Sequence, residues 1–453
     1  MSGRNDAQLT TSRKVGFALG DHTITLAQSA LALVYLFFLT EVAGLRADLA
    51  GLVVWVARAV DAFTDPAMGH VSDRMTWKVG RRRPFFLIGA IPFGVAFALL
   101  WWIPADSQAT KFLYYTAVSI GLSLSMTILA VPYFALLPEM ARSDQERSSL
   151  NAYRTAAAVV GTLAAVGLQP LAAHLGGPDD SGYLKAGVVF ACWLAVPWLI
   201  VFRVASEELP VERSPLGVFA SLGLVARHRY YRVLAGLYVM GRIAIDVTGA
   251  VLLFYFTHWL GRPDDFAPTL VVLFGAVILS LPLWLVLAKR LEKKAIFVLG
   301  ASIWIVAVVP LALAGSTWPR WSIFSLAALI GIGYAVVDFM PWAMLGDVVD
   351  EGEVMNGSRR EGLYAGVFTF LRKLGGATGV AFVGFGLSVA GYVPGSSQGP
   401  VTLVAVRAIA TALPAAFLAI AITLAWRYRV TRSAQARIRL DLAAAKKPVR
   451  ELR

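Results

Sequence analysis

Long apolar runs fill most of the chain and alternate with short polar segments. Each run extends over about 20 residues or more, the length that an α-helix needs to cross the hydrocarbon core of a membrane. Proline and glycine inside several runs are compatible with spanning helices, because neighbouring helices satisfy the freed backbone groups. We therefore predict an all-α integral membrane protein. Its twelve transmembrane helices are expected near residues 15–42, 47–68, 84–104, 111–138, 150–175, 184–203, 232–259, 267–288, 295–315, 320–346, 361–391 and 401–427.

The composition agrees with this pattern. Of the 453 residues, 58% are hydrophobic and only 15% are charged, whereas soluble proteins have about 45–50% and roughly 25%. The low charged fraction argues against a cytosolic enzyme, and against a nucleic-acid partner despite the net charge of +13. Cys192 is the only cysteine, so neither an internal disulfide nor a cysteine metal site is expected. We find no nucleophile–base pair and no histidine cluster in a span, and we predict neither enzymatic activity nor a cofactor.

The basic residues indicate the orientation. With the N-terminus placed in the cytoplasm, most of the 41 Lys and Arg residues fall on the cytoplasmic tails and loops. This asymmetry follows the positive-inside rule. We predict a multi-pass plasma-membrane protein of the bacterial inner-membrane type, with both termini cytoplasmic and membrane lipids around it. The few basic residues of the outward loops are Arg46, Lys111, Lys185, Arg262, Arg320 and Arg407.

An internal repeat relates the two halves of the chain. Three segments recur after about 210 residues at equivalent spans, which indicates a duplicated six-helix unit. Two parallel repeats of this kind are typical of major-facilitator transporters, whose substrate site lies between the halves. A channel or a membrane-embedded enzyme is the alternative, and the duplication makes it less favoured. The matching segments are 83–90 with 294–301, 131–136 with 340–345, and 149–152 with 362–365.

The repeat predicts four regions. Residues 1–203 form an N-terminal six-helix bundle and residues 232–428 form a C-terminal one. The cytoplasmic segment 204–231 connects the bundles, and residues 429–453 form a basic cytoplasmic tail.

Ionisable residues inside the predicted spans are the candidate functional groups. Each costs about 2.5–3.5 kcal/mol on insertion scales, and such residues usually mark transport pathways. Asp61 and Asp65 are one helical turn apart on the same face. Two close carboxylates repel, so one must hold a proton or both must share a cation. Thr64 and Thr127 offer hydroxyl ligands for Na⁺ or H⁺ coupling, whereas a structural pairing of Arg58 with Asp61 is the alternative.

Further charges and aromatic residues extend this picture. Asp21 is expected in a substrate cavity or at the cytoplasmic interface, and Arg154 and Lys373 lie on equivalent spans of the two halves. We expect both basic residues to bind substrate or to hold a conformation. Arg242 and Asp246, four residues apart, predict a structural ion pair within the seventh span. The role of Asp338 is left open. Phe134 and Trp342 are candidates for stacking on a sugar ring or lining an acyl pocket, and packing is the alternative.

These motifs carry a family resemblance. The segment Asp61-Ala-Phe-Thr-Asp65-Pro66, with Gly80-Arg-Arg-Arg-Pro84 after it, resembles the glycoside–pentoside–hexuronide:cation symporters. The likeness extends over nearly the whole chain and keeps the order of the motifs. It implies a major-facilitator fold, a small-molecule sugar or glycoside as substrate, cotransport with Na⁺ or H⁺, and a monomer. Further matching segments are 131–133, 344–345, 347–350 and 391–394.

The resemblance also assigns roles to residues. It implies a cation site of Asp61, Asp65 and Thr127, with Thr64 where the family's best-known member has a side-chain amide. It implies substrate contacts from Asp21 and Arg154, whereas Ala130 replaces the acid that the family carries on span four. Lys373 matches the span-eleven lysine that links the halves. The loop of residues 74–83 resembles the latch between facilitator halves, and a plain positive-inside loop is the alternative. The latch residues would be Asp73, Arg74, Arg81, Arg82 and Arg83.

Two other families share part of these motifs. Segments 131–133, 146–147 and 152–154 are similar to the animal lysophosphatidylcholine symporters, which use Na⁺ and bind an acyl chain in an apolar cavity. The plant-type sucrose/proton symporters share residues 80–84. The leading expectation is therefore a cation-coupled sugar or glycoside symporter, and a lysophospholipid symporter is the runner-up.

Overall fold

The computed structural model describes most of the chain. The described residues are 9–75, 77, 79–104, 107–141, 143–176, 181–207, 228–356, 361–428, 430, 435, 437 and 438. The predicted connection 204–231 and the predicted tail 429–453 lie for the most part outside these residues.

Regular structure in the described ranges is entirely helical, which confirms the predicted all-α class. Each predicted span coincides with one helix or with consecutive helical segments. Eight of these stretches are long and apolar enough to cross a membrane, and α3 (Pro84–Leu99) is a shorter apolar helix. Other predicted spans contain charged residues that lower their mean hydropathy. One of them is α2 (Ala47–Arg74), which carries Arg58, Asp61 and Asp65.

The chain divides into two compact units. The first unit comprises Met1–Arg213 together with Val383–Thr402, and the second comprises Ser214–Phe382 together with Leu403–Arg453. Besides α2 and α3, the helices of the first unit are α1 (Thr11–Ala30), α4 (Gln108–Met140), α5 (Asp144–Val166), α6 (Leu168–Leu175) and α7 (Gly182–Val204).

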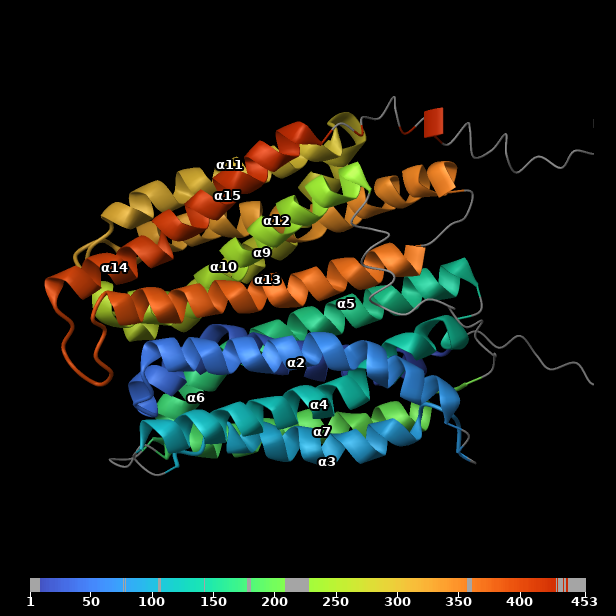
Figure 1. Ribbon diagram of the computed structural model, residues 1–453, viewed down its shortest axis with the longest axis horizontal. Helices are drawn as coiled ribbons and strands as arrows, with labels where there is room; N and C mark the ends of the chain where they lie inside the picture. The colour runs from blue at the N-terminus through green and yellow to red at the C-terminus, as the bar shows by residue number, and fades with distance from the viewer. Residues whose placement is uncertain are drawn as a thin grey trace, which may run out of the picture. The chain divides into compact units, whose positions relative to one another are not determined.

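Close packing of small residues sets the helix contacts of the first unit. α1 packs along α5. α4 packs against both α2 and α3, and α3 in turn contacts α7 (Figure 1). At Gly161 on α5, a Cβ atom would lie 2.4 Å from the carbonyl oxygen of His22 on α1. The two backbones therefore approach more closely than any residue other than glycine allows. The side chain of Ser143 caps the start of α5 by accepting a hydrogen bond from the Glu146 amide at 3.1 Å.

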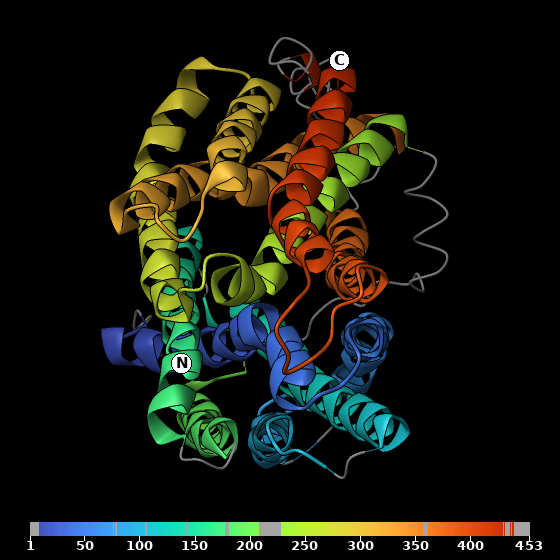
Figure 2. The same ribbon diagram turned by 90° about the vertical axis from the view of Figure 1, so that its left-hand side faces the viewer.

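The second unit repeats this helical construction. α9 contacts α12 and α15, and α11 packs against both α12 and α15. Figure 2 shows α15 in red beside α9 in light green. Its helices, with α13 and α14 only in part, are α9 (Arg229–Phe254), α10 (Phe266–Arg290), α11 (Lys293–Leu313), α12 (Arg320–Asn356), α13 (Glu361–Val389), α14 (Pro400–Ala410) and α15 (Ala412–Arg427).

The first helix of each repeat continues into π-helical turns. After α1 these are Leu31–Tyr35 and Phe38–Val42, and after α9 a π-helical turn extends over Tyr255–Trp259. Within the first unit, the Tyr392 hydroxyl donates a hydrogen bond to Glu41 in the second of these turns. This contact fastens the segment after α13 to the end of the first helix.

We expect Gly161→Ala to destabilise the protein, because its new methyl group would push α5 away from α1. Overpacking of this kind costs about 1–3 kcal/mol, so the midpoint of thermal unfolding in detergent should fall. Gly121→Ala on α4 is the matched control, since no atom of a neighbouring segment lies within 4 Å of its Cβ position. Alanine is favoured over glycine by roughly 0.5–1 kcal/mol inside a helix, so the control should keep or raise the midpoint. Equal midpoints for the two variants would contradict the close α1–α5 contact.

Candidate functional site

Two carboxylates of α2 meet one hydroxyl of α4. The Thr127 Oγ1 lies 3.0 Å from Asp61 Oδ1 and 2.9 Å from Asp65 Oδ1. Asp61 is 1% exposed, and Asp65 is half-buried one turn further along the same helix. Three oxygen donors of the predicted cation site are thus brought together. The Thr64 hydroxyl donates to the backbone oxygen of Asp61 at 3.3 Å, and its role as a cation ligand stays a prediction.

The hydroxyl of Thr127 carries a single proton. It can donate to one carboxylate at a time, although both lie within hydrogen-bonding distance. The second short oxygen–oxygen contact becomes favourable when a carboxyl group is protonated or a cation lies among the oxygens. Carboxylate and hydroxyl oxygens are the ligands that hard cations prefer, so the donor set fits either Na⁺ or H⁺.

A second cluster joins α1, α4 and α5. The guanidinium of Arg154 makes a two-point ion pair with the Asp21 carboxylate, through Nε to Oδ2 and through Nη2 to Oδ1, the latter at 3.2 Å. Tyr133 donates its hydroxyl to Asp21 Oδ2 at 2.7 Å. The side chains of Asp21 and Arg154 are each 13% exposed, so they are largely withdrawn from solvent. The predicted residues Asp21 and Arg154 are therefore direct partners.

Two aromatic rings complete this cluster. The Arg154 guanidinium lies over the rings of Tyr133 and Phe134, with its carbon 5.4 and 5.3 Å from their centroids. Phe134 is 46% exposed and offers a free face, whereas Tyr133 is buried. The sequence motif around residues 131–133 pointed to Tyr133, but its hydrogen bond to Asp21 was not predicted. An aromatic residue in a helix has the same sequence pattern whether it only packs against a neighbour or also hydrogen-bonds to a buried carboxylate.

The charges predicted on α9 form an ion pair inside the second unit. Arg242 contacts Asp246 through Nη2 at 2.6 Å and Nε at 2.7 Å, and contacts Asp338 on α12 at 3.3 Å. A Cβ atom at Gly376 on α13 would lie 2.1 Å from Asp246 Oδ2. Because Gly376 has no side chain, the buried carboxylate of Asp246 can lie against α13. The ion pair predicted from the spacing of Arg242 and Asp246 is present, and Asp338 is a further partner of Arg242.

Trp342 belongs to an aromatic cluster of the same unit. Its indole N–H donates to the Tyr238 hydroxyl at 3.0 Å, and its ring lies 5.1 Å from that of Phe368. Trp342 remains 39% exposed, which leaves part of the ring available to a ligand. Lys373 lies half-buried on α13. The substrate roles of Trp342 and Lys373 stay predictions.

The predicted latch residues form a network within the first unit. Arg82 is buried and contacts both Glu139 at the end of α4 and, at 2.6 Å, Asp73 on α2. Arg81 also binds Glu139, at 2.8 Å. Glu139 lies beyond the apolar part of α4, and burial raises its pKa while Arg82 and Arg81 oppose the shift. Arg74 lies in the last turn of α2. A latch between the two halves stays a prediction.

Glu207, which the sequence did not single out, binds the same loop. Its carboxylate accepts hydrogen bonds from the backbone amides of Arg81, Arg82 and Arg83 at 2.6, 2.8 and 2.8 Å. Gly80 makes this possible with a φ of +119°, and a Cβ there would lie 2.8 Å from Glu207 Oε1. The guanidinium of Arg83 donates to the Phe202 carbonyl at 2.8 Å. The α2–α3 turn is thus fixed to the end of α7.

The second unit contains an equivalent contact. Lys293, at the start of α11, donates to the Ala343 carbonyl at 2.8 Å and to Asp347 at 2.7 Å. Arg82, just before α3, donates to the Ala135 carbonyl at 2.8 Å and to Glu139. A basic residue before or at the start of the third helix therefore binds the fourth helix in both repeats.

Comparisons with known proteins agree with this architecture. The family model described as "MFS/sugar transport protein" matches residues 16–432. A putative glycoside/cation symporter of Escherichia coli strain K12, YagG, is 30% identical over 412 residues, which cover 87% of this chain and 86% of the relative. A glucuronide carrier protein homolog of the same strain is 29% identical over 452 residues and 98% of each chain.

A solved structure has the same fold. A chain from work on proton-dependent oligopeptide transporters superimposes with a TM-score of 0.67 at 14% identity, over 95% of this chain and 99% of that chain. At this identity the likeness shows the fold alone. The family model and the named relatives describe membrane transport and not catalysis. The match over most of the length confirms the resemblance to glycoside–pentoside–hexuronide:cation symporters, and the chain belongs to the MFS/sugar transport protein family.

Proposed function

We propose that this protein moves a sugar or glycoside across the membrane together with Na⁺ or H⁺, by alternating access. The observation that carries the proposal is the position of Thr127 between Asp61 and Asp65. Two acidic side chains in a membrane span are costly unless a cation or proton accompanies them. A facilitator that only equilibrates sugar has no need of such a site.

The coupling cation is cargo, held by the two carboxylates and the hydroxyl. A bound Na⁺ or proton removes the repulsion between Asp61 and Asp65 and holds α2 against α4. If this arrangement favours substrate binding, substrate favours cation binding by the same factor, because linkage is reciprocal. Typical couplings of this kind change affinity by about 5- to 150-fold.

The substrate site of the first unit is centred on Asp21 and Arg154. A carboxylate accepts hydrogen bonds from sugar hydroxyls, and the guanidinium donates to hydroxyl or acidic oxygens. The exposed face of Phe134 offers an apolar surface beside them. The relatives, a putative glycoside/cation symporter and a glucuronide carrier protein homolog, favour a sugar or glycoside over a lysophospholipid. In the second unit we assign Trp342 and Lys373 to the same substrate.

The remaining assignments follow the sequence. We place both termini in the cytoplasm of a bacterial-type inner membrane, on the distribution of Lys and Arg. We assign residues 1–203 and 232–428 to the two bundles that move against each other, with the protein acting as a monomer. The residues Asp73, Arg74 and Arg81–Arg83 would hold one conformation.

Asp65→Asn should abolish accumulation of sugar in proteoliposomes, because the variant keeps the shape of the site but removes one of its two charges. Cation-dependent binding of the sugar should weaken by about 5- to 150-fold. Asp264→Asn, at an exposed position of the short 3-10 helix Pro263–Asp265, is the control and should accumulate sugar normally. Uphill uptake by Asp65→Asn at the normal rate would refute the assignment of Asp65.

Imposing one ion gradient at a time distinguishes Na⁺ from H⁺ as the coupling ion. Uptake driven by a Na⁺ gradient at equal pH identifies Na⁺, whereas uptake driven by a pH gradient in Na⁺-free buffer identifies H⁺. Thr127→Ser keeps a hydroxyl and should retain coupled uptake, whereas Thr127→Val should lose it. Sugar uptake that responds to neither gradient would contradict cotransport.

A double-variant cycle tests the substrate role of Asp21 and Arg154. Asp21→Asn alone leaves a buried guanidinium without its partner and should cost about 3–5 kcal/mol of stability. Adding Arg154→Gln removes the stranded charge, so the midpoint of thermal unfolding should largely recover. Transport should remain absent in the double variant because the sugar contacts are gone. Recovery of transport along with stability would show that the ion pair is only structural.

A further inference from the structure

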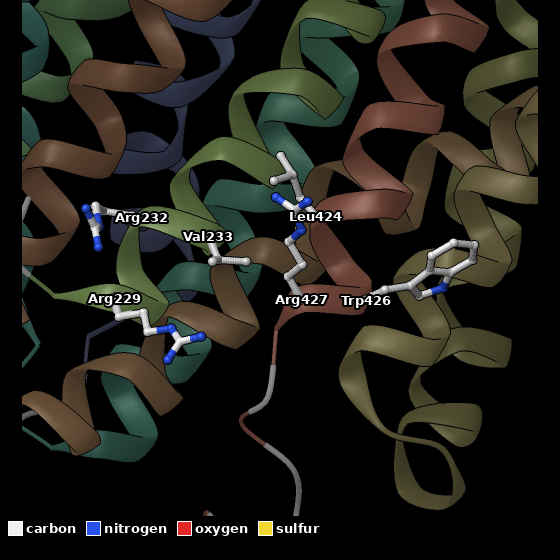
Figure 3. A pocket seen from close by; sticks show the side chains of 6 residues that line it. All are labelled: Arg229, Arg232, Val233, Leu424, Trp426 and Arg427. Atoms are coloured by element: carbon white, nitrogen blue, oxygen red, sulfur yellow. The ribbon is translucent and has the colours of Figure 1, made fainter.

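Three arginines surround a cavity at one end of the second unit. The cavity measures about 610 Å³ and is lined by Arg229, Arg232, Val233, Leu424, Trp426 and Arg427. Arg229 and Arg232 lie in the first turn of α9, and Arg427 is the last residue of α15 (Figure 3). Its size is within the range of small-molecule sites, roughly 300–1,000 Å³.

The cavity is cationic, and no described acidic side chain neutralises its charges. All three arginines are exposed, and among the described residues none of them forms an ion pair with an acidic side chain. The neighbouring residue Tyr428 is buried, and its hydroxyl donates to the Met344 carbonyl on α12 at 3.4 Å. Asp347, on the same helix, is bound by Lys293 at 2.7 Å. An anion in the cavity would therefore meet three guanidinium groups that no acidic side chain in the described ranges pairs with.

The position of the cavity indicates which kind of anion it binds. It lies where α9 begins and α15 ends, at the boundary of two helices that are long and apolar enough to span a membrane. Trp426 is 70% exposed, and tryptophan is enriched at the level of lipid headgroups. Val233 and Leu424 give the cavity an apolar wall beside the arginines (Figure 3). Guanidinium groups bind phosphate oxygens at two points, and the apolar wall suits the glycerol and upper acyl carbons of a lipid.

We infer that this cavity binds the phosphate headgroup of an anionic phospholipid. In the orientation proposed above, it faces the cytoplasmic leaflet, where anionic lipids attract basic clusters. The site is separate from the intramembrane carboxylates, and the inference does not depend on which cation or sugar is transported.

Lipid retention by the purified full-length protein tests this inference. The protein in neutral detergent is titrated with phosphatidylglycerol or phosphatidylcholine, and bound lipid is measured by native mass spectrometry. We expect preferential binding of phosphatidylglycerol, which should weaken by about fivefold for each of Arg229→Gln, Arg232→Gln and Arg427→Gln. The thermal midpoint in lipid-free detergent should stay unchanged, since all three side chains are exposed.

Arg203→Gln is the matched control, because Arg203 is also an exposed arginine in the last turn of a helix, α7. It should bind phosphatidylglycerol as the wild type does. An equal loss of binding in Arg203→Gln would show a general charge effect and overturn the site. Unchanged lipid preference in a variant that combines Arg229→Gln, Arg232→Gln and Arg427→Gln would also overturn it. Inorganic phosphate is titrated as a third ligand. If phosphate stabilises the protein while phosphatidylglycerol is not preferred over phosphatidylcholine, the cavity binds a free anion and not a lipid headgroup.

Discussion

Burying charge among apolar helices requires a partner for each charged group, and this requirement determines which helices meet in each unit. Arg154 and Asp21 hold α5 to α1, while Thr127 holds α4 to the two acids of α2. In the second unit, Arg242 connects α9 to α12 through Asp338. Unlike apolar contacts, these pairings are directional, so they fix the rotation of each helix about its axis. Loss of one partner leaves a charge where solvent cannot compensate it.

The sequence predicted single helices better than the contacts between them. The spacing of Asp61 and Asp65 placed both acids on one face, and the spacing of Arg242 and Asp246 placed an ion pair within one helix. Both follow from the 3.6-residue period alone. Thr127 and Arg154 lie on other helices, so no spacing within one helix relates them to their acids. Thr127 was expected as a hydroxyl ligand, and the family resemblance assigned both residues to their sites. Tyr133 and Glu207 were missed as hydrogen-bond partners because no periodic pattern in one helix identifies the helix beside it.

The duplicated units preserve a contact while changing its chemistry. Arg82 serves the first unit with a guanidinium that binds Glu139, Asp73 and a backbone carbonyl at once. Lys293 has a single ammonium group in the second unit and binds Asp347 and one carbonyl. Arginine can connect three elements because its donors are spread over a planar fork, whereas lysine presents them from one atom. The first unit consequently has the more highly connected loop.

The π-helical turns after α1 change the phase of the first helix. Each wide turn contains about one residue more than an α-turn, so the side chains beyond it are rotated by roughly 100°. A helical wheel started at Asp21 therefore assigns the wrong azimuth to residues beyond Leu31. Glu41 reaches Tyr392 on an azimuth that such a wheel does not predict. One continuous apolar run thus contains segments of different phase, and a single amphipathic stripe cannot describe it.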